Sequence, residues 1–268
     1  MHIIPLWATI VEGTIHNQFA LDEYFGTILR VVTTRQSFPK SVSIYTFNFY
    51  FSLLAEKNNV LPGQIVTSTR YVGRKLFCGT GQGQFFAVTF IPNHFFINVY
   101  PNINLDGQIR YLHPLNQNYM LGFGRGPLGN GLRVWVLSIS SPFPQQVGIF
   151  PLNNQFATSN LEYDHRAFMI YPQYFLVVIP LRNAFTFNGA LILRLNPGFT
   201  WTFTPKVIHH YVPPDTQPIF GDRTVDRSAY INEYVYTKSK CLLKVKKISD
   251  ILNNIGIEYS LPLPCAWW

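Results

Sequence analysis

The residues best placed to do chemistry in this sequence are Asp164 and His165, which stand next to each other. A carboxylate beside an imidazole can orient a general base or contribute to a metal site. The same pair at the turn before a strand can instead bond to backbone groups and hold one structural repeat on the next. Because the pair lies in a phrase that recurs along the chain, we expect this structural role.

At two other places in the sequence, histidines allow the same two interpretations, a structural role or a chemical role such as metal binding. His113 follows Tyr111 by two residues and invites the same structural interpretation as His165. His209 and His210 end a predicted strand before a proline-rich loop, where a metal role is the alternative. We expect no metal site and no cofactor in this chain.

One glycine-rich segment matches a nucleotide-binding pattern. Residues Gly124 to Gly129 read Gly-Arg-Gly-Pro-Leu-Gly, which fits GxGxxG. A dinucleotide site requires this pattern to follow a strand and to open a helix, so that the helix N-terminus meets the pyrophosphate. Here Pro127 interrupts the segment, and a predicted strand at 132–139 follows it. The sequence therefore favours a hairpin tip.

The acidic residues do not form an obvious acid–base pair. Asp22 and Glu23 are adjacent on an extended segment, so their side chains point to opposite faces. The chain also contains no Cys–His or Ser–His constellation typical of nucleophilic catalysis. We therefore predict that the protein is not an enzyme, and an active site in the central channel of the fold described below is the alternative.

The composition favours strands over helices. The 268 residues are 47% apolar and 16% aromatic, with 23 Phe and 15 Tyr, whereas charged residues make up 13%. Aromatic and β-branched side chains pack well on a pleated surface. The 19 Pro and 18 Gly are spread along the chain, as many short strands joined by turns require.

The net charge of +8 suggests an anionic neighbour such as RNA, DNA or a lipid surface. The basic residues are nevertheless scattered, and their densest cluster alternates with apolar residues, so that it resembles one wet face of a strand. We expect a solvated basic surface, with RNA contact as the alternative. The cluster consists of Lys238, Lys240, Lys244, Lys246 and Lys247.

The cysteines and the hydrophobic segments exclude several classes of protein. Cys78, Cys241 and Cys265 form no CxxC pair, which argues against a zinc site, and they allow at most one disulfide. No run of 18 or more apolar residues exists, so we expect no membrane span. The first eleven residues lack a basic region and form a poor signal peptide.

A tyrosine phrase recurs along the chain and predicts the fold. In each case an aromatic residue is followed by a short polar turn and then by an apolar strand. The tyrosines are 47, 40, 52 and 67 residues apart, and a repeat of about 40 to 50 residues built from short strands is typical of a β-propeller blade. The five positions are Tyr24, Tyr71, Tyr111, Tyr163 and Tyr230.

We therefore predict an all-β chain, a complete or partial β-propeller of about five blade units. It would form a single domain over residues 1–268, with residues 247–268 as a C-terminal tail. Expected strands include 29–34, a long one at 42–54, 85–90, 119–123 and 132–139. Ser249 could cap one short helix at 250–255.

The chain resembles a family of secreted proteins with a C-terminal β-propeller domain, distantly related to WD-type repeats and found mostly in archaea and bacteria. The likeness covers roughly residues 13 to 250. It implies the propeller fold and an extracytoplasmic or cell-surface location, but no catalytic site, since the family has no established chemistry. The blocks that carry it are 17–24 leading into 29–34, 70–77, 111–115 with 121–125, 163–168, 189–192 and 227–231.

Two departures from the family affect the expected function. Members of the family are longer, with further blades and usually an export signal, and residues 79–84 replace their Asp-Pro-rich stretch. A blade needs about 40 to 45 residues, so five anchors give about five blades or fewer. An unclosed propeller leaves strand edges open. We therefore expect a protein partner, a companion chain or a further segment to complete or cover it, and a small five-bladed closure is the alternative.

These observations predict a binding or scaffold module for protein–protein interaction within a larger assembly. The runner-up is a basic structural subunit of a ribonucleoprotein or organellar complex inside the cell, supported by the charge and by the missing export signal. Trp267 and Trp268 could be a docking handle, because Trp is enriched at binding hot spots, or could lie against the bottom of a blade.

Overall fold

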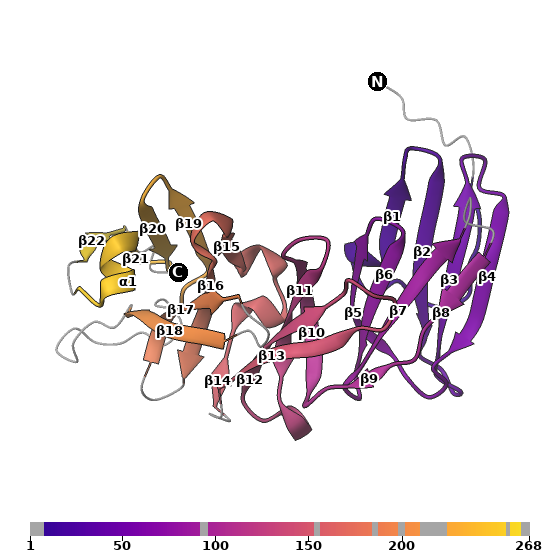
Figure 1. The fold of residues 1–268 in the computed structure, drawn as a ribbon, viewed down its shortest axis with the longest axis horizontal. Helices are drawn as coiled ribbons and strands as arrows, with labels where there is room; N and C mark the ends of the chain where they lie inside the picture. Colours follow the sequence, from indigo (N-terminus) through magenta and orange to yellow (C-terminus); the bar gives the residue numbers. More distant parts are fainter. Residues whose placement is uncertain are drawn as a thin grey trace. The chain divides into compact units, whose positions relative to one another are not determined.

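The chain forms strands almost throughout. The computed structural model describes residues 8–91, 96–152, 156–183, 187–197, 202–209, 224–255 and 258–263. Within these ranges the strands make five antiparallel sheets of four or five strands each (Figure 1). This arrangement confirms the predicted all-β fold with about five blade units.

The first three sheets follow one another along the chain. Sheet 1 contains β1 (Leu21–Tyr24), β2 (Ile28–Arg35), β3 (Ser41–Asn48) and β4 (Leu53–Val60). Sheet 2 contains β5 (Val66–Val72), β6 (Lys75–Thr80), β7 (Gln84–Ile91), β8 (Phe96–Val99) and the short β9 (Ile103–Asn104). Sheet 3 contains β10 (Gln108–Pro114), β11 (Tyr119–Arg125), β12 (Leu132–Ser138) and β13 (Gln145–Leu152).

The last two sheets are built in the same way. Sheet 4 contains β14 (Ala157–Thr158), β15 (Met169–Tyr171), β16 (Leu176–Asn183), β17 (Phe187–Asn196) and β18 (Thr202–His209). Sheet 5 contains β19 (Arg227–Ile231), β20 (Tyr234–Lys238), β21 (Leu242–Lys247) and β22 (Tyr259–Pro262). The helical elements are α1 (Ile248–Asn253) and the 3-10 turns η1 (Gln18–Ala20), η2 (Pro127–Gly129), η3 (Asn160–Glu162), η4 (His165–Ala167) and η5 (Pro172–Tyr174).

The chain divides into two compact units. One comprises residues 1–129 and 134–147, and the other comprises residues 130–133 and 148–268. Sheets 1 and 2 lie wholly in the first unit, and sheets 4 and 5 wholly in the second. Each unit therefore contains a pair of sheets whose packing can be described on its own.

In the first unit, sheets 1 and 2 share an apolar core. Val32 and Ile44 of sheet 1 pack in one cluster with Phe86 and Val88 of sheet 2. On β2 the neighbouring side chain, Val31, points to the opposite face and packs in a separate cluster with Tyr45 and Phe47. The middle strands are thus apolar on both faces, as strands between stacked layers must be.

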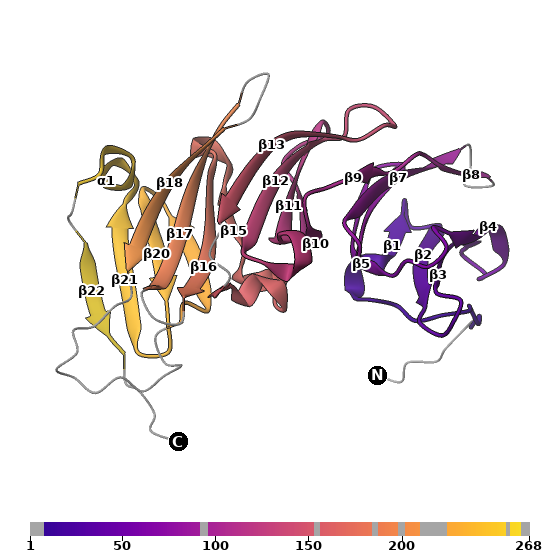
Figure 2. The same cartoon turned by 90° about the horizontal axis from the view of Figure 1, so that it is seen from below.

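In the second unit, sheets 4 and 5 pack in the same manner. Val178 and Ile192 of sheet 4 lie in one core with Val235 of sheet 5 and with Ile248 and Ile251 of α1. Figure 2 shows β16 to β18 alongside β20 and β21. The outermost strand β22 is exposed along its whole length.

Two local predictions were wrong. The strand expected at 42–54 is broken by a turn, because the Asn48 side-chain carbonyl accepts hydrogen bonds from the backbone N–H groups of Tyr50 (2.9 Å) and Ser52 (3.0 Å). The helix expected at 250–255 begins instead at Ile248, with Lys247 in the cap position and Ser249 inside the helix. A short polar side chain can redirect the backbone in ways that apolar periodicity does not reveal.

The glycine-rich segment joins two strands of one sheet. Gly124 lies in β11, η2 forms one tight turn, and β12 begins at Leu132. No helix that could present its N-terminus to a phosphate follows the segment, which agrees with the predicted hairpin tip. Among the described residues, no helix has the length and apolar character needed to cross a membrane.

The glycine at 124 is required by close backbone approach. A Cβ atom at Gly124 would lie 1.9 Å from the carbonyl oxygen of Gln108, whereas a Cβ at Gly129 would meet nothing within 4 Å. We therefore expect Gly124→Ala to lower the free energy of unfolding by roughly 3 kcal/mol or more, because the β10–β11 backbone must move. Gly129→Ala, whose φ is +79°, should cost only about 1 kcal/mol. Urea unfolding of the two variants measures the difference, and equal losses would contradict it.

Candidate binding surfaces and the contacts that position them

Four of the five predicted tyrosines lie on the first strand of a sheet. Tyr24 ends β1, Tyr71 lies on β5, Tyr111 on β10 and Tyr230 on β19. Tyr71 and Tyr230 hold the same register, because each lies opposite the second residue of the next strand, just before a two-residue turn.

Tyr163 differs from the other four. It follows η3, lies outside any strand and is 88% exposed. In sheet 4 the corresponding strand position belongs to Tyr171, which lies opposite Leu176 next to the turn between β15 and β16. The sequence spacing pointed to Tyr163 because η3 and η4 lengthen the segment that leads into β15.

A buried arginine connects sheet 1 to sheet 2. The Arg30 side chain is 2% exposed and donates from Nε to the Asp22 carboxylate at 2.9 Å, with a second ion-pair contact from Nη2. Its Nη1 donates to the carbonyl oxygen of Gly73, in the turn after Tyr71, at 2.8 Å. The guanidinium lies over the rings of Tyr24 and Tyr71, with its central carbon 4.5 and 4.6 Å from their centroids. We call this arrangement an inter-sheet clamp.

A second clamp connects sheet 2 to the first strand of sheet 3. Arg70 Nε donates to the carbonyl oxygen of Leu112 at 2.9 Å, one residue after Tyr111. The Arg70 guanidinium also lies 3.7 Å from the Phe19 ring centroid and 5.4 Å from that of Tyr111. Burial lowers the pKa of Arg70. Stacking on aromatic rings and a hydrogen bond to the backbone keep this buried cation favourable.

The third clamp, in the second unit, uses a tyrosine in place of an arginine. The ring of Tyr171 stacks on that of Tyr230, with centroids 3.9 Å apart and planes at 8°. Its hydroxyl donates to the carbonyl oxygen of Asn232 at 3.1 Å. Asn232 occupies the first turn position after the tyrosine phrase of sheet 5, as Gly73 does in sheet 2. The recurring tyrosine thus marks the point where one sheet bonds to the next.

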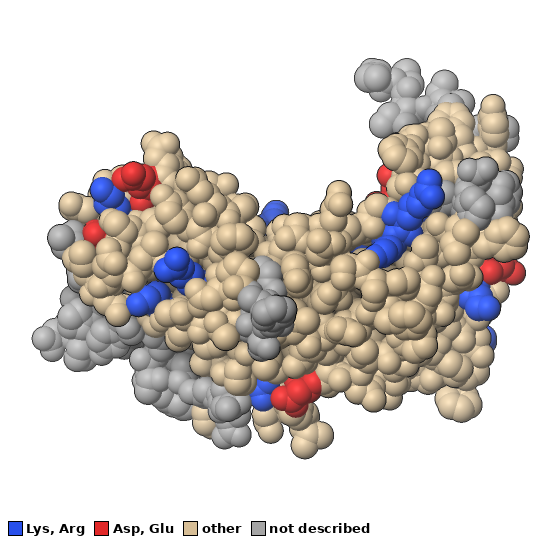
Figure 3. Space-filling model, viewed as in Figure 1, with Lys and Arg blue, Asp and Glu red and all other residues tan. Residues whose placement is uncertain are grey.

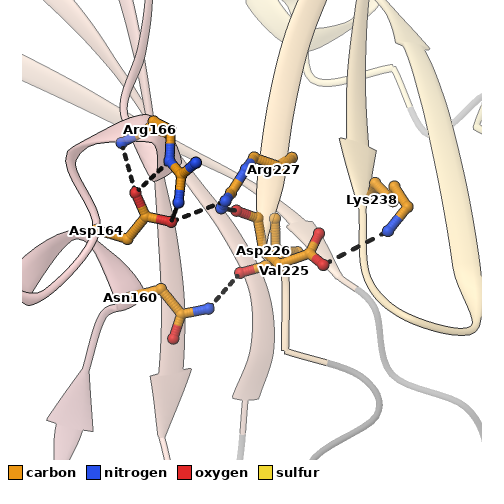
Figure 4. A network of polar contacts seen from close by, with 7 residues as sticks. All are labelled: Asn160, Asp164, Arg166, Val225, Asp226, Arg227 and Lys238. Carbon is orange, nitrogen blue, oxygen red and sulfur yellow. Dashed lines mark hydrogen bonds and ion pairs between the residues drawn. The ribbon is translucent and has the colours of Figure 1, made fainter.

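Asp164 lies in a polar network that also joins sheets 4 and 5 (Figure 4). Its carboxylate accepts from the backbone N–H of Arg166 at 3.0 Å, which caps η4, and from Arg227 Nη2 on β19 at 2.7 Å. The Arg166 side chain lowers the pKa of Asp164 to about 2, and Arg227 acts in the same direction. His165 begins η4 beside it. These contacts leave Asp164 ionised and committed to the two arginines.

His113 is held against the second clamp. The Tyr111 hydroxyl and His113 Nδ1 are 3.1 Å apart. Burial, and after it the nearby Arg70 guanidinium, lowers the pKa of His113 to about 4. The imidazole is therefore neutral at physiological pH and packs as part of the inter-sheet contact.

The described residues hold no group of three or more His, Cys, Asp or Glu side chains arranged to bind a metal ion. His209 ends β18, while His210, Trp267 and Trp268 lie outside the residues that the structure describes. The predicted docking role of the two tryptophans stays a prediction.

Exposed aromatic side chains gather at one end of sheet 1. The turns β1–β2 and β3–β4 lie at the same end, because Ile28 pairs with Asn48 across β2 and β3 (Figure 1). Two strand spacings, roughly 10 Å, separate the turns. Phe25 is 83% exposed, and Phe49 and Tyr50 are each 61% exposed. We call this surface the aromatic tip, formed by Phe25, Phe49, Tyr50, Phe51 and Leu53.

The backbone of the aromatic tip is unusual. Phe25 and Phe51 have φ values of +52° and +59°, in the left-handed region that bulky side chains avoid. Glycine or asparagine would occupy these turn positions at lower cost. The sequence pattern did not reveal the tip, because Phe49 and Phe51 read as continuing a buried strand.

Charged side chains do not form a continuous band on the visible surface. Figure 3 shows Lys and Arg in small, separate groups on the face that it presents. Several of them are paired, such as Lys244 with Glu258 and Lys247 with Glu233. On the face that Figure 3 presents, this distribution agrees with the expected solvated basic surface.

The sequence matches a family model described as the beta propeller domain over residues 5–251. The chain belongs to this family. The propeller is also 27% identical over 260 residues to an uncharacterized protein of Methanocaldococcus jannaschii. The match covers 94% of the propeller chain but only 38% of that relative, so the chain spans well under half of the relative's length.

Solved structures share the fold at low identity. A chain in a structure of the Mitotic Checkpoint Complex matches with a TM-score of 0.51 and 11% identity, covering 90% of the propeller chain and 64% of its own. A candidate 6-phosphogluconolactonase from Bacteroides uniformis matches with a TM-score of 0.49 and 11% identity, covering 91% and 71%. At this identity the first likeness describes the fold alone, and the second adds nothing to it.

The first clamp predicts a large stability effect at Arg30. Arg30→Met should lower the free energy of unfolding by about 3 kcal/mol, because it leaves the Asp22 carboxylate partly buried without its cation. Arg35, 43% exposed and paired with Glu12, is the matched control, and Arg35→Met should cost less than about 1 kcal/mol. The double variant Arg30→Met with Asp22→Asn should regain part of the loss. Chemical unfolding of the four proteins tests this, and an equal loss in both single variants would contradict it.

The clamp around His113 predicts a pH dependence. Because the folded-state pKa of His113, about 4, lies below the ordinary value of 6.5, the unfolded chain binds its proton more readily. The contribution of His113 to stability is complete above pH 6.5 and declines as the pH falls toward 4. An NMR titration should find the imidazole neutral at pH 5.5, and Arg70→Gln should raise its pKa. A midpoint near 6.5 in the unsubstituted protein would refute the burial argument.

Proposed function

We propose that this propeller is a non-enzymatic binding module that holds a protein partner through its aromatic tip within a larger assembly. One observation carries the proposal: two phenylalanines, Phe25 and Phe51, occupy left-handed turn positions at the same end of sheet 1, where Phe25 is 83% exposed and Phe51 is 36% exposed. A left-handed conformation costs a non-glycine residue roughly 1–2 kcal/mol. Neither ring recovers that cost by full burial in the core of the folded chain.

Burial in a partner would recover the cost. Aromatic side chains are enriched at protein interfaces, where they supply a large contact area at little loss of conformational freedom. Phe49 and Tyr50 already pack edge to face, with centroids 5.7 Å apart, so they are ordered before a partner arrives. Strained positions cluster at binding sites, because the surrounding structure holds them ready for contact.

The turn scaffold beneath the tip is rigid enough for this role. The Asn48 side-chain carbonyl accepts two backbone hydrogen bonds within the turn. The Asn48 backbone carbonyl accepts a third, from the N–H of Phe51 at 2.9 Å. The partner would be a separate protein or a companion chain that completes or covers the propeller. The fold is compatible with such a place, since a chain of similar fold occurs in the Mitotic Checkpoint Complex.

We also propose an extracytoplasmic or cell-surface location, as the resemblance implies. Cys241 is disulfide-bonded, and disulfides persist chiefly in oxidising compartments. The alternative, an intracellular or organellar assembly, predicts a reduced Cys241. Alkylation before and after reduction, read by mass spectrometry on protein from its native source, separates the two.

The aromatic tip predicts that partner binding and stability respond in opposite directions. A photoreactive phenylalanine analogue at position 50 should crosslink one protein in the native cell. For the purified pair, Phe49→Ala and Tyr50→Ala should each weaken binding by about tenfold or more, the size typical of an interface hot spot. Phe51→Gly should also weaken binding, yet keep or raise the melting temperature, because it removes the left-handed strain.

The matched control is Phe38, which is 95% exposed in the turn at the opposite end of sheet 1. Phe38→Ser should leave binding unchanged. Crosslinking to RNA, or binding that falls steeply with salt, would support the ribonucleoprotein alternative instead. Unchanged binding in both Phe49→Ala and Tyr50→Ala would overturn the proposal.

A further inference from the structure

A polar pocket lies at the end of the apolar core of the second unit. On β16 alternate side chains share one face, and Leu176 and Val178 of that face belong to the core between sheets 4 and 5. The same row continues with Pro180 and ends in Arg182, and both of these residues line the pocket. The side chains of β16 that face sheet 5 are therefore apolar at Leu176 and Val178, whereas the last of them is the guanidinium of Arg182.

The pocket has the size of a small-molecule site. Its volume is about 290 Å³, near the lower end of the roughly 300–1,000 Å³ common for ligand pockets. Sheet 4 and the segment before it supply one wall, while the start of β19 and the β20–β21 turn supply the other. The lining residues are Thr158, Ser159, Asn160, Pro180, Arg182, Thr224, Asp226 and Lys240.

Hydrogen bonds between the two sides of the pocket fix its walls. Asn160 Nδ2 donates to the carbonyl oxygen of Val225 at 3.2 Å, which ties the two walls together (Figure 4). The backbone N–H of Asp226 donates to the carbonyl oxygen of Lys238 at 2.9 Å. The pocket is thus formed before any ligand enters, which reduces the conformational cost of binding.

Two charged groups in the pocket have unused bonding capacity. Asp226 Oδ2 lies 3.5 Å from Lys238 Nζ, whereas the buried Oδ1 has no hydrogen-bond partner among the described residues. Arg182 likewise forms no side-chain hydrogen bond or ion pair with them. A buried acceptor without a donor costs free energy, and so does an unpaired cation that is half-buried. A ligand anion paired with Arg182 would recover the cost of the unpaired cation.

The chemistry of the lining selects the ligand. Two cations, Arg182 and Lys240, face one carboxylate, so the lining favours a compound with a net negative charge. The hydroxyls of Thr158, Ser159 and Thr224 suit a ligand rich in hydroxyl groups. The described lining contains no aromatic ring, so it offers nothing on which a nucleobase could stack.

We propose that this pocket binds a small hydroxy acid of the sugar-acid class. The ligand carboxylate pairs with the Arg182 guanidinium, which suits bidentate recognition of a planar carboxylate. A ligand hydroxyl donates to the accessible part of the Asp226 carboxylate, whose side chain is 35% exposed. The site lies in the second unit and is independent of the aromatic tip, so it adds a small-molecule ligand to the proposed protein partner.

Isothermal titration calorimetry of the full chain with D-glucuronate tests the proposal. Glucuronate should bind more tightly than D-glucose, which lacks the carboxylate, and than acetate, which lacks the hydroxyls. Arg182→Gln should weaken binding by about tenfold or more, as expected for loss of a charge-assisted pair. The matched control is Arg194 on the neighbouring strand β17, which is exposed and lies outside the pocket, and Arg194→Gln should bind normally.

Each outcome decides the proposal. The ligand series on the unsubstituted protein remains decisive if Arg182→Gln does not fold. The proposal is overturned if no heat is detected at millimolar glucuronate, or if inorganic phosphate and acetate bind as well as glucuronate, since the pocket would then hold any anion. Equal binding by Arg182→Gln and Arg194→Gln would also place the ligand elsewhere.

Discussion

The structure depends on one recurring constraint within each unit, the bonding of one sheet to the first strand of the next sheet or to the turn after it. At these junctions a side chain of one sheet reaches the backbone of the neighbouring sheet at or near its tyrosine phrase. Backbone carbonyl oxygens that lose contact with water need donors. Arg30, Arg70 and Tyr171 each supply a donor to a carbonyl oxygen and a flat group to cover the tyrosine ring. Three different residues from different strands thus solve the same physical problem.

Because the middle strands pack between other strands and sheets, few of their side chains can reach a ligand. In β2 and β3 most side chains are buried on both faces, and Arg30 of β2 serves the contact with the next sheet. Side chains that can meet a ligand are therefore confined to turns, outer strands and the ends of the cores. The aromatic tip at the turns of sheet 1 and the polar pocket at the end of the sheet 4–5 core follow this rule. Asp164 and His113 do not, because Asp164 pairs with two arginines and His113 lies against the Tyr111 hydroxyl.

Two kinds of unusual backbone position occur in the chain, and they have different physical reasons. Gly124 has no room for a side chain, because β10 and β11 approach closely there, and glycine solves this problem without strain. Phe25 and Phe51 stand in turns where glycine would fit and a phenylalanine is costly. The fold explains the first choice. The proposed contact with a partner offers a reason for the second.

The sequence by itself determined the all-β fold and the number of blade units. These features rest on composition and on a repeat, which can be read without knowing which residues meet in the fold. The structural roles expected for Tyr163, Asp164 and His113 were hypotheses drawn from the same repeat, and the contacts of these residues came only from the structure.

Only the tertiary structure decided which side chains meet. The turn at 49–52 depends on hydrogen bonds of Asn48 and interrupts a run of aromatic residues that reads as one strand. The substitution of Tyr171 for Tyr163 in the clamp depends on two 3-10 turns that lengthen the approach to β15. The pocket brings Arg182 and Asp226 together from different sheets. The spacing of residues along the chain does not show which residues line one pocket, because the packing of one sheet on another brings them together.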